Sequence, residues 1–257
     1  MQFDLISDLH VEHWPDSIEW KGLGTSLVAV IVGDVSQDLD IMYQTVVEIS
    51  KHYRHVVYVD GNHEHNDRGN INARREEIQQ MFAKYRNITF LYRNTVVLDS
   101  VAFVGANGWF SFDFCEPFMT KQECFHSLLD EGKDQAVMFE QWEMAMEDAD
   151  HMAQVIGTLN SDPGVKEIVM VTHTVPDRRL TWLKDDHNIH FLGVQGSSFL
   201  EKLKDLNTKG KMTTWVFGHL HQAKDEVLDG IRYISNPRGI PEHQNAQKIY
   251  YPKFIKN

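Results

Sequence analysis

The stretch from Val57 to Asp67, VYVDGNHEHND, places a short apolar run directly before a group of polar residues. The run Val57 to Val59 has the β-branched and aromatic side chains that favour a buried strand. The residues Gly61 to Glu64 follow at once, and asparagine, histidine and glutamate can bind metals or transfer protons. One such cluster is weak evidence, so its meaning depends on whether other strands of the chain end in the same way.

Composition sets the class of protein. The chain has 257 residues, of which 42% are hydrophobic and 24% are charged, and this is typical of a globular protein with a large core. Because α/β folds of this length are commonly one unit, we predict a single domain over residues 1–257. The formal net charge of −12 disfavours long nucleic acid as the main partner, since phosphate neutralisation dominates such binding. A small phosphate ester is compatible with this charge, because bound metal ions can reverse the local field.

Cysteine content and targeting signals favour the cytoplasm. Only Cys115 and Cys124 are cysteines, so no disulfide framework is required and a reducing compartment fits. The longest apolar run, Leu27 to Val32, is far shorter than the ~20 residues of a membrane-spanning helix. The first residues include Asp4 and Asp8 and lack the basic and apolar regions of a signal peptide. We therefore predict a cytoplasmic protein with no membrane segment, and the sequence leaves a homo-oligomer open.

The first third of the chain alternates strand and helix patterns. Apolar β-branched runs predict strands at residues 3–7, 27–32 and 55–59. Apolar residues at helical spacing predict helices at residues 39–53 and 72–85. From the second strand onward the order is βαβα, which favours a largely parallel inner sheet with crossover helices.

The rest of the chain adds strands around an aromatic and helical segment. Short strands are predicted at residues 88–91, 96–98 and 101–105, followed by an irregular aromatic stretch at 107–132. Residues 134–159 predict a long helix with an apolar stripe of Met138, Trp142, Met146, Ala149 and Ala153. Residues 107–160 are therefore interpreted as a candidate cap or interface segment within the domain. Further elements are predicted as a strand at 168–171, a helix at 198–207, a strand at 214–217 and a hairpin at 227–234 that turns at Asp229–Gly230.

Five of the predicted strands end in similar polar clusters. They are Asp8-Leu9-His10, Gly33-Asp34, Gly61-Asn62-His63-Glu64, Thr172-His173-Thr174 and Gly218-His219-Leu220-His221. In open α/β sheets the carboxyl ends of the strands line the ligand crevice, so these segments can converge. Each cluster alone has an ordinary explanation as a turn or a surface pair. Their occurrence together, each after an apolar strand, indicates a common site.

The residue types in these clusters favour reactive metal ions. Aspartate, asparagine and histidine without any thiolate suit Mn, Fe, Ni or Zn at a reactive site better than a structural zinc site. The candidate ligands are Asp8, His10, Asp34, Asn62, His173, His219 and His221. These are too many for one ion and suit two ions about 3.5–4 Å apart that share a carboxylate and a hydroxide. In an extended chain the spacing of Asp8 and His10 puts both side chains on one face, and His219 and His221 have the same spacing.

Over residues 4 to about 240 the sequence resembles the calcineurin-like metallophosphoesterases, and the five clusters carry the resemblance. The resemblance implies an α/β fold, a four-layer α/β/β/α sandwich, with two metals at the strand ends. It implies that the first metal is bound by Asp8, His10, Asp34 and His221, and the second by Asp34, Asn62, His173 and His219. It also implies that His63 is not a ligand and acts near the leaving group, as a general acid or as a positive charge.

Two positions depart from the pattern of these relatives, and one further segment extends the resemblance. Many relatives have an acid three residues after the bridging aspartate, where this chain has Gln37, so Asp38 is the candidate for orienting the catalytic histidine. Glu64 stands where aspartate is also common, and a loop-stabilising role is favoured for it. The segment Ser235 to Gly239 resembles a segment of small bacterial and phage members. It makes Arg238 a candidate phosphate contact, with a rigid surface turn as the alternative.

The predicted function is hydrolysis of phosphate esters, with small phosphodiesters or nucleotides as the favoured substrates. Two divalent ions, with manganese first among the candidates, would generate a bridging hydroxide that attacks phosphorus in line with the leaving oxygen. Two alternatives stay open, a Ser/Thr-type protein phosphatase and a non-catalytic metal-binding interaction scaffold. His63 and the full ligand set argue against the scaffold, and a wall over the site would argue against a protein phosphatase.

The aromatic stretch after the strand at 101–105 offers candidate substrate contacts. Aromatic side chains can stack on a nucleobase, and here they are Trp109, Phe110, Phe112, Phe114 and Phe118. We predict that the segment from 109 to 118 reaches the rim of the metal site, with Phe112 and Phe114 as contacts. The alternative is that these residues only fill the core or a subunit contact.

Overall fold

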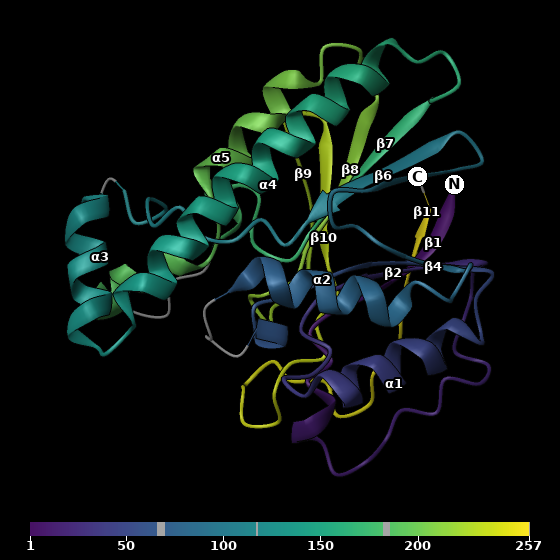
Figure 1. Ribbon diagram of the computed structural model, residues 1–257, viewed down its shortest axis with the longest axis horizontal. Helices are drawn as coiled ribbons and strands as arrows, with labels where there is room; N and C mark the ends of the chain where they lie inside the picture. The colour runs from purple at the N-terminus through teal and green to yellow at the C-terminus, as the bar shows by residue number, and fades with distance from the viewer. Residues whose placement is uncertain (66–69, 117, 182–185, 257) are drawn as a thin grey trace.

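Two β-sheets form the centre of the molecule in the computed structural model, which describes residues 1–65, 70–116, 118–181 and 186–256. The first sheet has the strand order β11 (Lys253–Lys256), β1 (Gln2–Ile6), β2 (Val28–Val32), β3 (His55–Val59) and β4 (Ile88–Phe90). The second has the order β5 (Thr95–Leu98), β6 (Val101–Ala106), β7 (Glu167–Thr172), β8 (Met212–Val216), β10 (Ile231–Ser235) and β9 (Lys224–Leu228). Helices cover the outer face of each sheet, which confirms the predicted four-layer α/β/β/α sandwich (Figure 1).

The inner strands are parallel, and this brings their carboxyl ends to one edge. Strands β1 to β4 pair in parallel, as do β6, β7, β8 and β10. The edge strands β11, β5 and β9 are antiparallel to their neighbours. The predicted hairpin is confirmed, with Asp229 and Gly230 both at positive φ between β9 and β10. Strand β11 was not predicted, because its residues carry no alternating pattern long enough to distinguish it from the tail.

Three apolar clusters hold the layers together. One lies between the sheets and is built by residues from both, such as Phe3, Val57, Phe103 and Val216. A second joins the first sheet to helices α1 (Leu39–Ser50) and α2 (Ile71–Phe82). The third joins the second sheet to α4 (Gln135–Ser161) and α5 (Ser198–Glu201). Because parallel sheets need cover on both faces, this arrangement explains why strands such as β2 are apolar throughout.

Short 3₁₀ segments connect many of these elements. They are η1 (Val11–His13), η2 (His63–His65), η3 (Arg178–Leu180), η4 (Asp186–Val194) and η5 (Lys202–Leu206). The helix predicted at residues 198–207 is divided between α5 and η5.

The segment between β6 and β7 forms a helical arm. The prediction that residues 107–132 are irregular is wrong in part, because α3 (Lys121–Asp130) begins with a capping box between Thr120 and Glu123. Figure 1 shows α3 at the far left, away from both sheets and next to the beginning of α4. The predicted stripe of α4 is also corrected, since Met144 and Met152 are buried whereas Met146 is 37% exposed.

A buried ionic network joins this arm to the first sheet. Arg75 of α2 donates two hydrogen bonds to Asp148 of α4, at 2.8 and 2.7 Å, and one to Asp60 at 3.1 Å. His65 pairs with the same Asp60 carboxylate at 2.7 Å. All four side chains are buried, and the pKa of Asp60 is held well below its usual range by the Arg75 charge although burial alone would raise it. The network therefore connects α2, α4 and the loop after β3.

We expect the Asp148→Asn variant to lose about 3–5 kcal/mol of unfolding free energy, because it leaves part of the buried Arg75 charge uncompensated. Glu147→Gln is the matched control on the same helix. Glu147 pairs with Arg93 at 3.2 Å, but both of those side chains are half or more exposed. The control should lose less than about 1 kcal/mol, the usual range for an exposed pair. Urea denaturation of both variants measures the difference, and equal losses would contradict a structural role for the network.

Candidate metal centre

The loops after the strands turn sharply, and this aims the candidate ligands at one point. Asp8, His10, Asp34, His219 and His221 all have φ between 42° and 74°, in the left-handed region that non-glycine residues rarely adopt. The prediction that Asp8 and His10 share a face of an extended chain is therefore corrected. Their side chains converge because the backbone has already left the strand. Each such residue costs on the order of 1–3 kcal/mol, a strain that clusters at functional sites.

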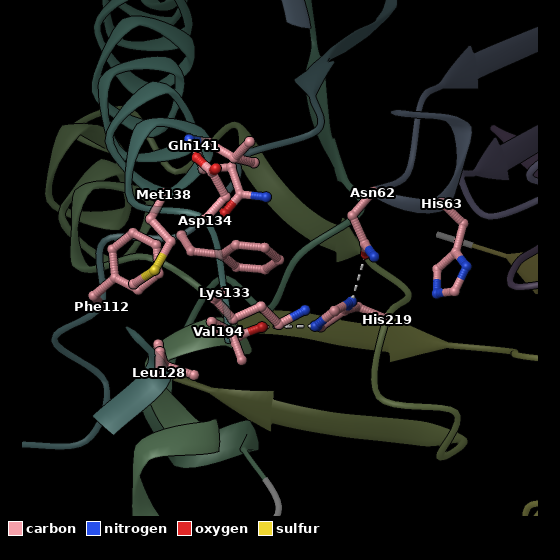
Figure 2. A pocket seen from close by; sticks show the side chains of 12 residues that line it. Asn62, His63, Phe112, Leu128, Lys133, Asp134, Met138, Gln141, Val194 and His219 are labelled. Atoms are coloured by element: carbon pink, nitrogen blue, oxygen red, sulfur yellow. Dashed lines mark hydrogen bonds between the residues drawn. The ribbon is translucent and has the colours of Figure 1, made fainter. Parts of the chain in front are cut away.

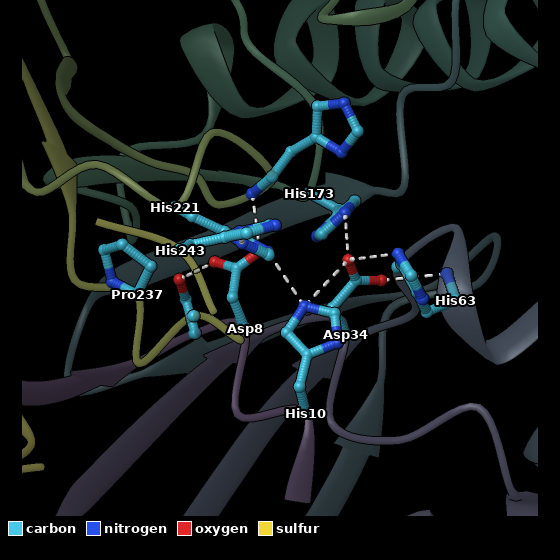
Figure 3. Close-up of polar contacts among 12 residues, drawn as sticks. Asp8, His10, Asp34, His63, His173, His221, Pro237 and His243 are labelled. Carbon is cyan, nitrogen blue, oxygen red and sulfur yellow. Dashed lines mark hydrogen bonds and ion pairs between the residues drawn. The ribbon is translucent and has the colours of Figure 1, made fainter. Parts of the chain in front are cut away.

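The seven predicted ligand residues lie together in two groups (Figure 3). Ligand atoms of Asp8, His10, Asp34 and His221 all lie within 4.8 Å of one another, and so do those of Asp34, His173 and His219. Asn62 Oδ1 lies 3.0 Å from both His173 Nε2 and His219 Nδ1 and so completes the second group. Asp34 belongs to both groups. Figure 3 shows its carboxylate between His10, His63 and His173.

Backbone carbonyls orient the two histidines of the second group. His173 Nδ1 donates to Val32 O at 2.8 Å, which leaves Nε2 facing Asp34 Oδ2 at 3.3 Å. His219 is turned the other way, since its Nε2 donates to Val194 O at 2.8 Å and its Nδ1 faces Asn62. A hydrogen bond from the second ring nitrogen to a carbonyl is the usual way in which a metal-binding histidine is oriented.

The first group brings two imidazole nitrogens unusually close. Nε2 of His10 lies 2.9 Å from Nε2 of His221. His10 Nε2 also lies 3.6 Å from Asp34 Oδ2, and His221 Nε2 lies 3.7 Å from Asp8 Oδ1. Burial lowers the pKa of His10 to about 2 and that of His221 to about 4, so both rings are neutral at pH 7. Neutral nitrogens and carboxylate oxygens that face one another form a donor set suited to a cation.

The pKa values of Asp34 and His173 are shifted in opposite directions, because the two side chains form an ion pair. Burial alone would raise the pKa of Asp34, but the charges of His173 and His63 hold it well below its usual range. Burial would lower the pKa of His173, and the Asp34 charge instead raises it to about 10. Burial and the nearby Asp34 charge raise the pKa of Asp8 to about 6, against the opposing effect of His173. The Asp34 carboxylate therefore favours a positive charge beside it, and a bound cation can supply that charge.

Glu64 stabilises the loops around the centre. Its buried carboxylate accepts backbone N–H groups of Asp34 at 3.0 Å, Val35 at 2.7 Å and Gly61 at 2.7 Å. These bonds join the loop after β2 to the loop after β3. A Cβ atom at Gly61 would lie 2.1 Å from Asp34 Oδ1, so this position has no room for any other residue.

His63 lies beside the two groups, and Gln37 is its partner. Gln37 Nε2 lies 2.9 Å from His63 Nδ1, and an amide N–H can only donate there, so the ring proton sits on Nε2. His63 Nε2 is 3.9 Å from Asp34 Oδ2, and the side chain is 28% exposed. Asp38, the residue predicted to orient His63, instead caps helix α1 by accepting from the amides of Asp40 and Ile41. The structure does not bring Asp38 to His63.

The three predicted substrate contacts lie in different places. Phe112 lines a pocket beside the centre, whereas Phe114 is buried against Gly196 and the guanidinium of Arg178. Arg238 is buried too, and its guanidinium lies 4.1 Å from the centre of the Trp14 ring. Its backbone N–H donates to Ser7 O at 3.0 Å. The structure thus keeps the loop of Arg238 next to the centre and places its side chain against Trp14.

Sequence reasoning missed a further histidine at the centre. His243 Nδ1 lies 2.7 Å from Nδ1 of His221, on an exposed loop near the end of the chain. This contact orients the His221 ring so that Nε2 faces the first group. No local pattern around His243 resembles a strand end, so no signal in the sequence indicated it.

Two pockets open onto the centre and share His63 and His219. The first has a volume of about 320 Å³ and lies between the centre and the helical arm, where Phe110, Phe112, Leu128 and Met138 line it (Figure 2). The second has a volume of about 760 Å³ and also contacts Asp34 and His221. The rest of its lining is Phe191, Leu220 and residues of the loop 240–245, which includes Glu242 and His243.

The model of the calcineurin-like phosphoesterase family matches residues 1–223. The chain belongs to this family. The predicted resemblance is thereby confirmed, and family membership implies divalent metal ions. A comparison with curated protein sequences found no match.

One solved structure, that of a phosphopantetheinyl hydrolase, supports the fold of this family member. The crystal structure of phosphopantetheinyl hydrolase from Mycobacterium tuberculosis aligns with a TM-score of 0.74 at 18% identity, over 93% of this chain and 90% of that chain. GAP50, the anchor in the inner membrane complex of Plasmodium, aligns with a TM-score of 0.49 at 14% identity, over 100% of this chain and 77% of that chain.

In the described part of the chain, none of the helices has the length and apolar character required to cross a bilayer.

The residues at the centre fit the metals that the family implies. Each group offers carboxylate oxygens and imidazole nitrogens, and neither group contains a cysteine. Asp34 is the one carboxylate that both groups share, so it is the residue suited to bridge two ions.

We expect the purified protein to bind about two Mn²⁺ ions per chain, because one ion would leave half of the converging donors unused. Asp34→Asn should reduce the stoichiometry below one, since it removes the carboxylate that both groups share. Elemental analysis after manganese loading and gel filtration measures both values. Asp38→Asn is the control and should keep two ions, because Asp38 caps α1 away from the centre. A wild-type value of one or less in folded protein would contradict the dinuclear centre.

Proposed function

We propose that this chain is a dinuclear metal-dependent hydrolase of small phosphodiesters, nucleotides among them. Family membership supports phosphoester hydrolysis, and the preference for diesters rests on the two pockets. A phosphodiester carries two organic arms on one phosphorus, whereas a monoester carries one. His63 and His219 line both pockets, so a phosphoryl group beside them has a separate space for each arm. The observation that carries the proposal is that both pockets are lined by the same two residues, His63 and His219.

The residues of the chain supply positioning and proton transfer. When bound, two divalent ions supply a water of lowered pKa and neutralise the phosphoryl oxygens. His63 lines both pockets, and its Nε2–H can donate a hydrogen bond or a proton to a leaving oxygen there. Gln37 holds the tautomer in which this is possible. Asn62 adds an oxygen donor without further negative charge, which keeps the centre attractive to an anionic substrate.

The proposal also includes the identity of the metal and the compartment in which the protein works. Manganese fits a donor set of nitrogen and oxygen atoms without sulfur, as do iron, nickel and zinc. Cys115 and Cys124 are both free and buried, which agrees with a reducing compartment and supports the cytoplasm. The second pocket includes Glu242, and its negative charge favours a neutral arm over a further phosphate.

Comparison of a diester with a monoester tests the proposal directly. The manganese-loaded protein should hydrolyse bis(4-nitrophenyl) phosphate with a kcat/KM at least about 10-fold above that of 4-nitrophenyl phosphate, because only the diester fills both pockets. A phosphopantetheinyl ester belongs in the same panel in view of the structural neighbour, although an identity of 18% bears on the fold alone. A monoester preference would sink the diester proposal, and hydrolysis of a phosphoserine peptide above both would favour a protein phosphatase.

We expect His63→Ala to lower kcat by roughly 10²–10⁴-fold, the usual size of a general-acid contribution. The variant should still bind about two manganese ions per chain, because His63 lies outside both ligand groups. Stopped assays with the diester and elemental analysis of the same sample separate catalysis from metal binding. Loss of the metals together with the rate would show that His63 belongs to the ligand set.

A further inference from the structure

The pocket beside the helical arm, called here the α4 pocket, is a space next to the metal centre. Asn62, His63 and His219 line the side next to the centre, and Figure 2 shows Phe112, Leu128 and Met138 gathered away from these three residues. Phe112, Leu128 and Met138 are all at most 3% exposed. The volume of about 320 Å³ lies at the lower end of the range for sites of small organic ligands. It therefore fits one small substituent rather than a polymer.

The charges around the α4 pocket balance one another. Lys133 and Asp134 are the only charged side chains among the described lining residues apart from the histidines. Helix α4 begins at this pocket, but Asp134 accepts the amides of Ala136 and Val137 at 2.8 and 3.1 Å. The helix end therefore already has an anionic partner. This lining therefore has no excess of positive charge that would favour a second phosphate, and it suits an uncharged group.

The apolar walls favour a flexible chain or a small ring over a stacked nucleobase. Phe110 and Phe112 have ring centres 6.3 Å apart and planes inclined at 62°, so they form no parallel slot. The other apolar lining residues are aliphatic or methionine, including Val137, Met138 and Val194. Gln141 adds an uncharged amide that can meet a hydroxyl or amide group.

The walls of the α4 pocket are tied to one another, so the pocket is largely preformed. Cys124 of α3 lies against η4, where its Sγ donates to His190 O at 3.3 Å. His190 Nε2 lies 2.8 Å from Glu131 Oε1 at the end of α3. These contacts fix Leu128 on one wall relative to Val194 on the next. A preformed apolar pocket binds without the cost of ordering its own side chains.

We propose that the α4 pocket binds one uncharged, largely apolar arm of the phosphodiester substrate and so selects substrates by that arm. The inference rests on the proposed function, because the metal centre must hold the phosphoryl group for the arm to enter. Val137 and Met138 of α4 are specificity-determining residues in this view, and the second pocket takes the more polar arm.

Binding of alkylphosphonates to the manganese-loaded protein tests the α4 pocket without turnover. Methylphosphonate and hexylphosphonate carry the same anionic head, and only the latter has an arm that reaches the α4 pocket. Calorimetry should give hexylphosphonate a Kd at least 10-fold below that of methylphosphonate, which corresponds to about 1.4 kcal/mol. Val137→Trp should fill the pocket and reduce this advantage to less than about 2-fold, while the Kd of methylphosphonate stays unchanged.

Phe139→Trp is the matched control, because Phe139 lies on the same helix but is 51% exposed and lines a different groove. It should keep the full hexyl advantage. Equal affinity of the wild type for both phosphonates would overturn the inference while leaving diester hydrolysis intact. An advantage that survives in Val137→Trp would place the arm elsewhere and overturn it as well. A protein that shows the hexyl advantage but hydrolyses no phosphoester would refute the proposed function and retain the apolar pocket.

Discussion

The carboxylate of Asp34 is the constraint on which the rest of the centre depends. It is buried at the meeting point of both ligand groups, within 3.3 Å of His173 Nε2, 3.6 Å of His10 Nε2 and 3.9 Å of His63 Nε2. A buried charge is costly unless it is paired and hydrogen-bonded. The surrounding loops meet this requirement, since the backbone N–H of His63 donates to Asp34 Oδ1 at 2.9 Å. The position of His63 is thereby coupled to the residue best placed to bridge the metals.

The backbone around Asp34 shows how the fold stabilises this arrangement. Asp34 adopts the left-handed region, and so do four other predicted ligands. The strain is offset by hydrogen bonds that close the loops, including those of Glu64 to three amides and that of Asp8 Oδ1 to the His219 amide at 2.8 Å. The loops are further joined to one another by Asp8 N–H to Gly33 O at 3.1 Å and Gly218 N–H to His173 O at 2.9 Å. The centre is thus held by the backbone before any metal contributes.

The sequence predicted the fold and the residues of the centre because both depend on strong local signals. An apolar strand followed closely by a metal-binding side chain occurs five times, three of them with a glycine between, and parallel pairing brings such ends together. The choice between Gln37 and Asp38 could not be predicted, because it depends on which of two neighbouring side chains faces the helix α1 amides. The contact of His243 with His221 depends on how a loop from the end of the chain folds back. Helix α3 had a signal, the Thr120 and Glu123 capping box, but the aromatic residues before it suggested irregular structure.

The buried network of Arg75 explains how the helical arm keeps its place relative to the centre. Asp148 of α4 accepts the Gly108 amide at 3.0 Å, and Asn107 Nδ2 donates to Asp60 O at 3.1 Å. Asn107 O in turn accepts the amide of His173 at 3.0 Å. Through Asp60 and Arg75 the same network reaches the turn that carries His63. Helix α4 lines the α4 pocket, so the same ion pairs connect the wall of this pocket to the turn that carries His63.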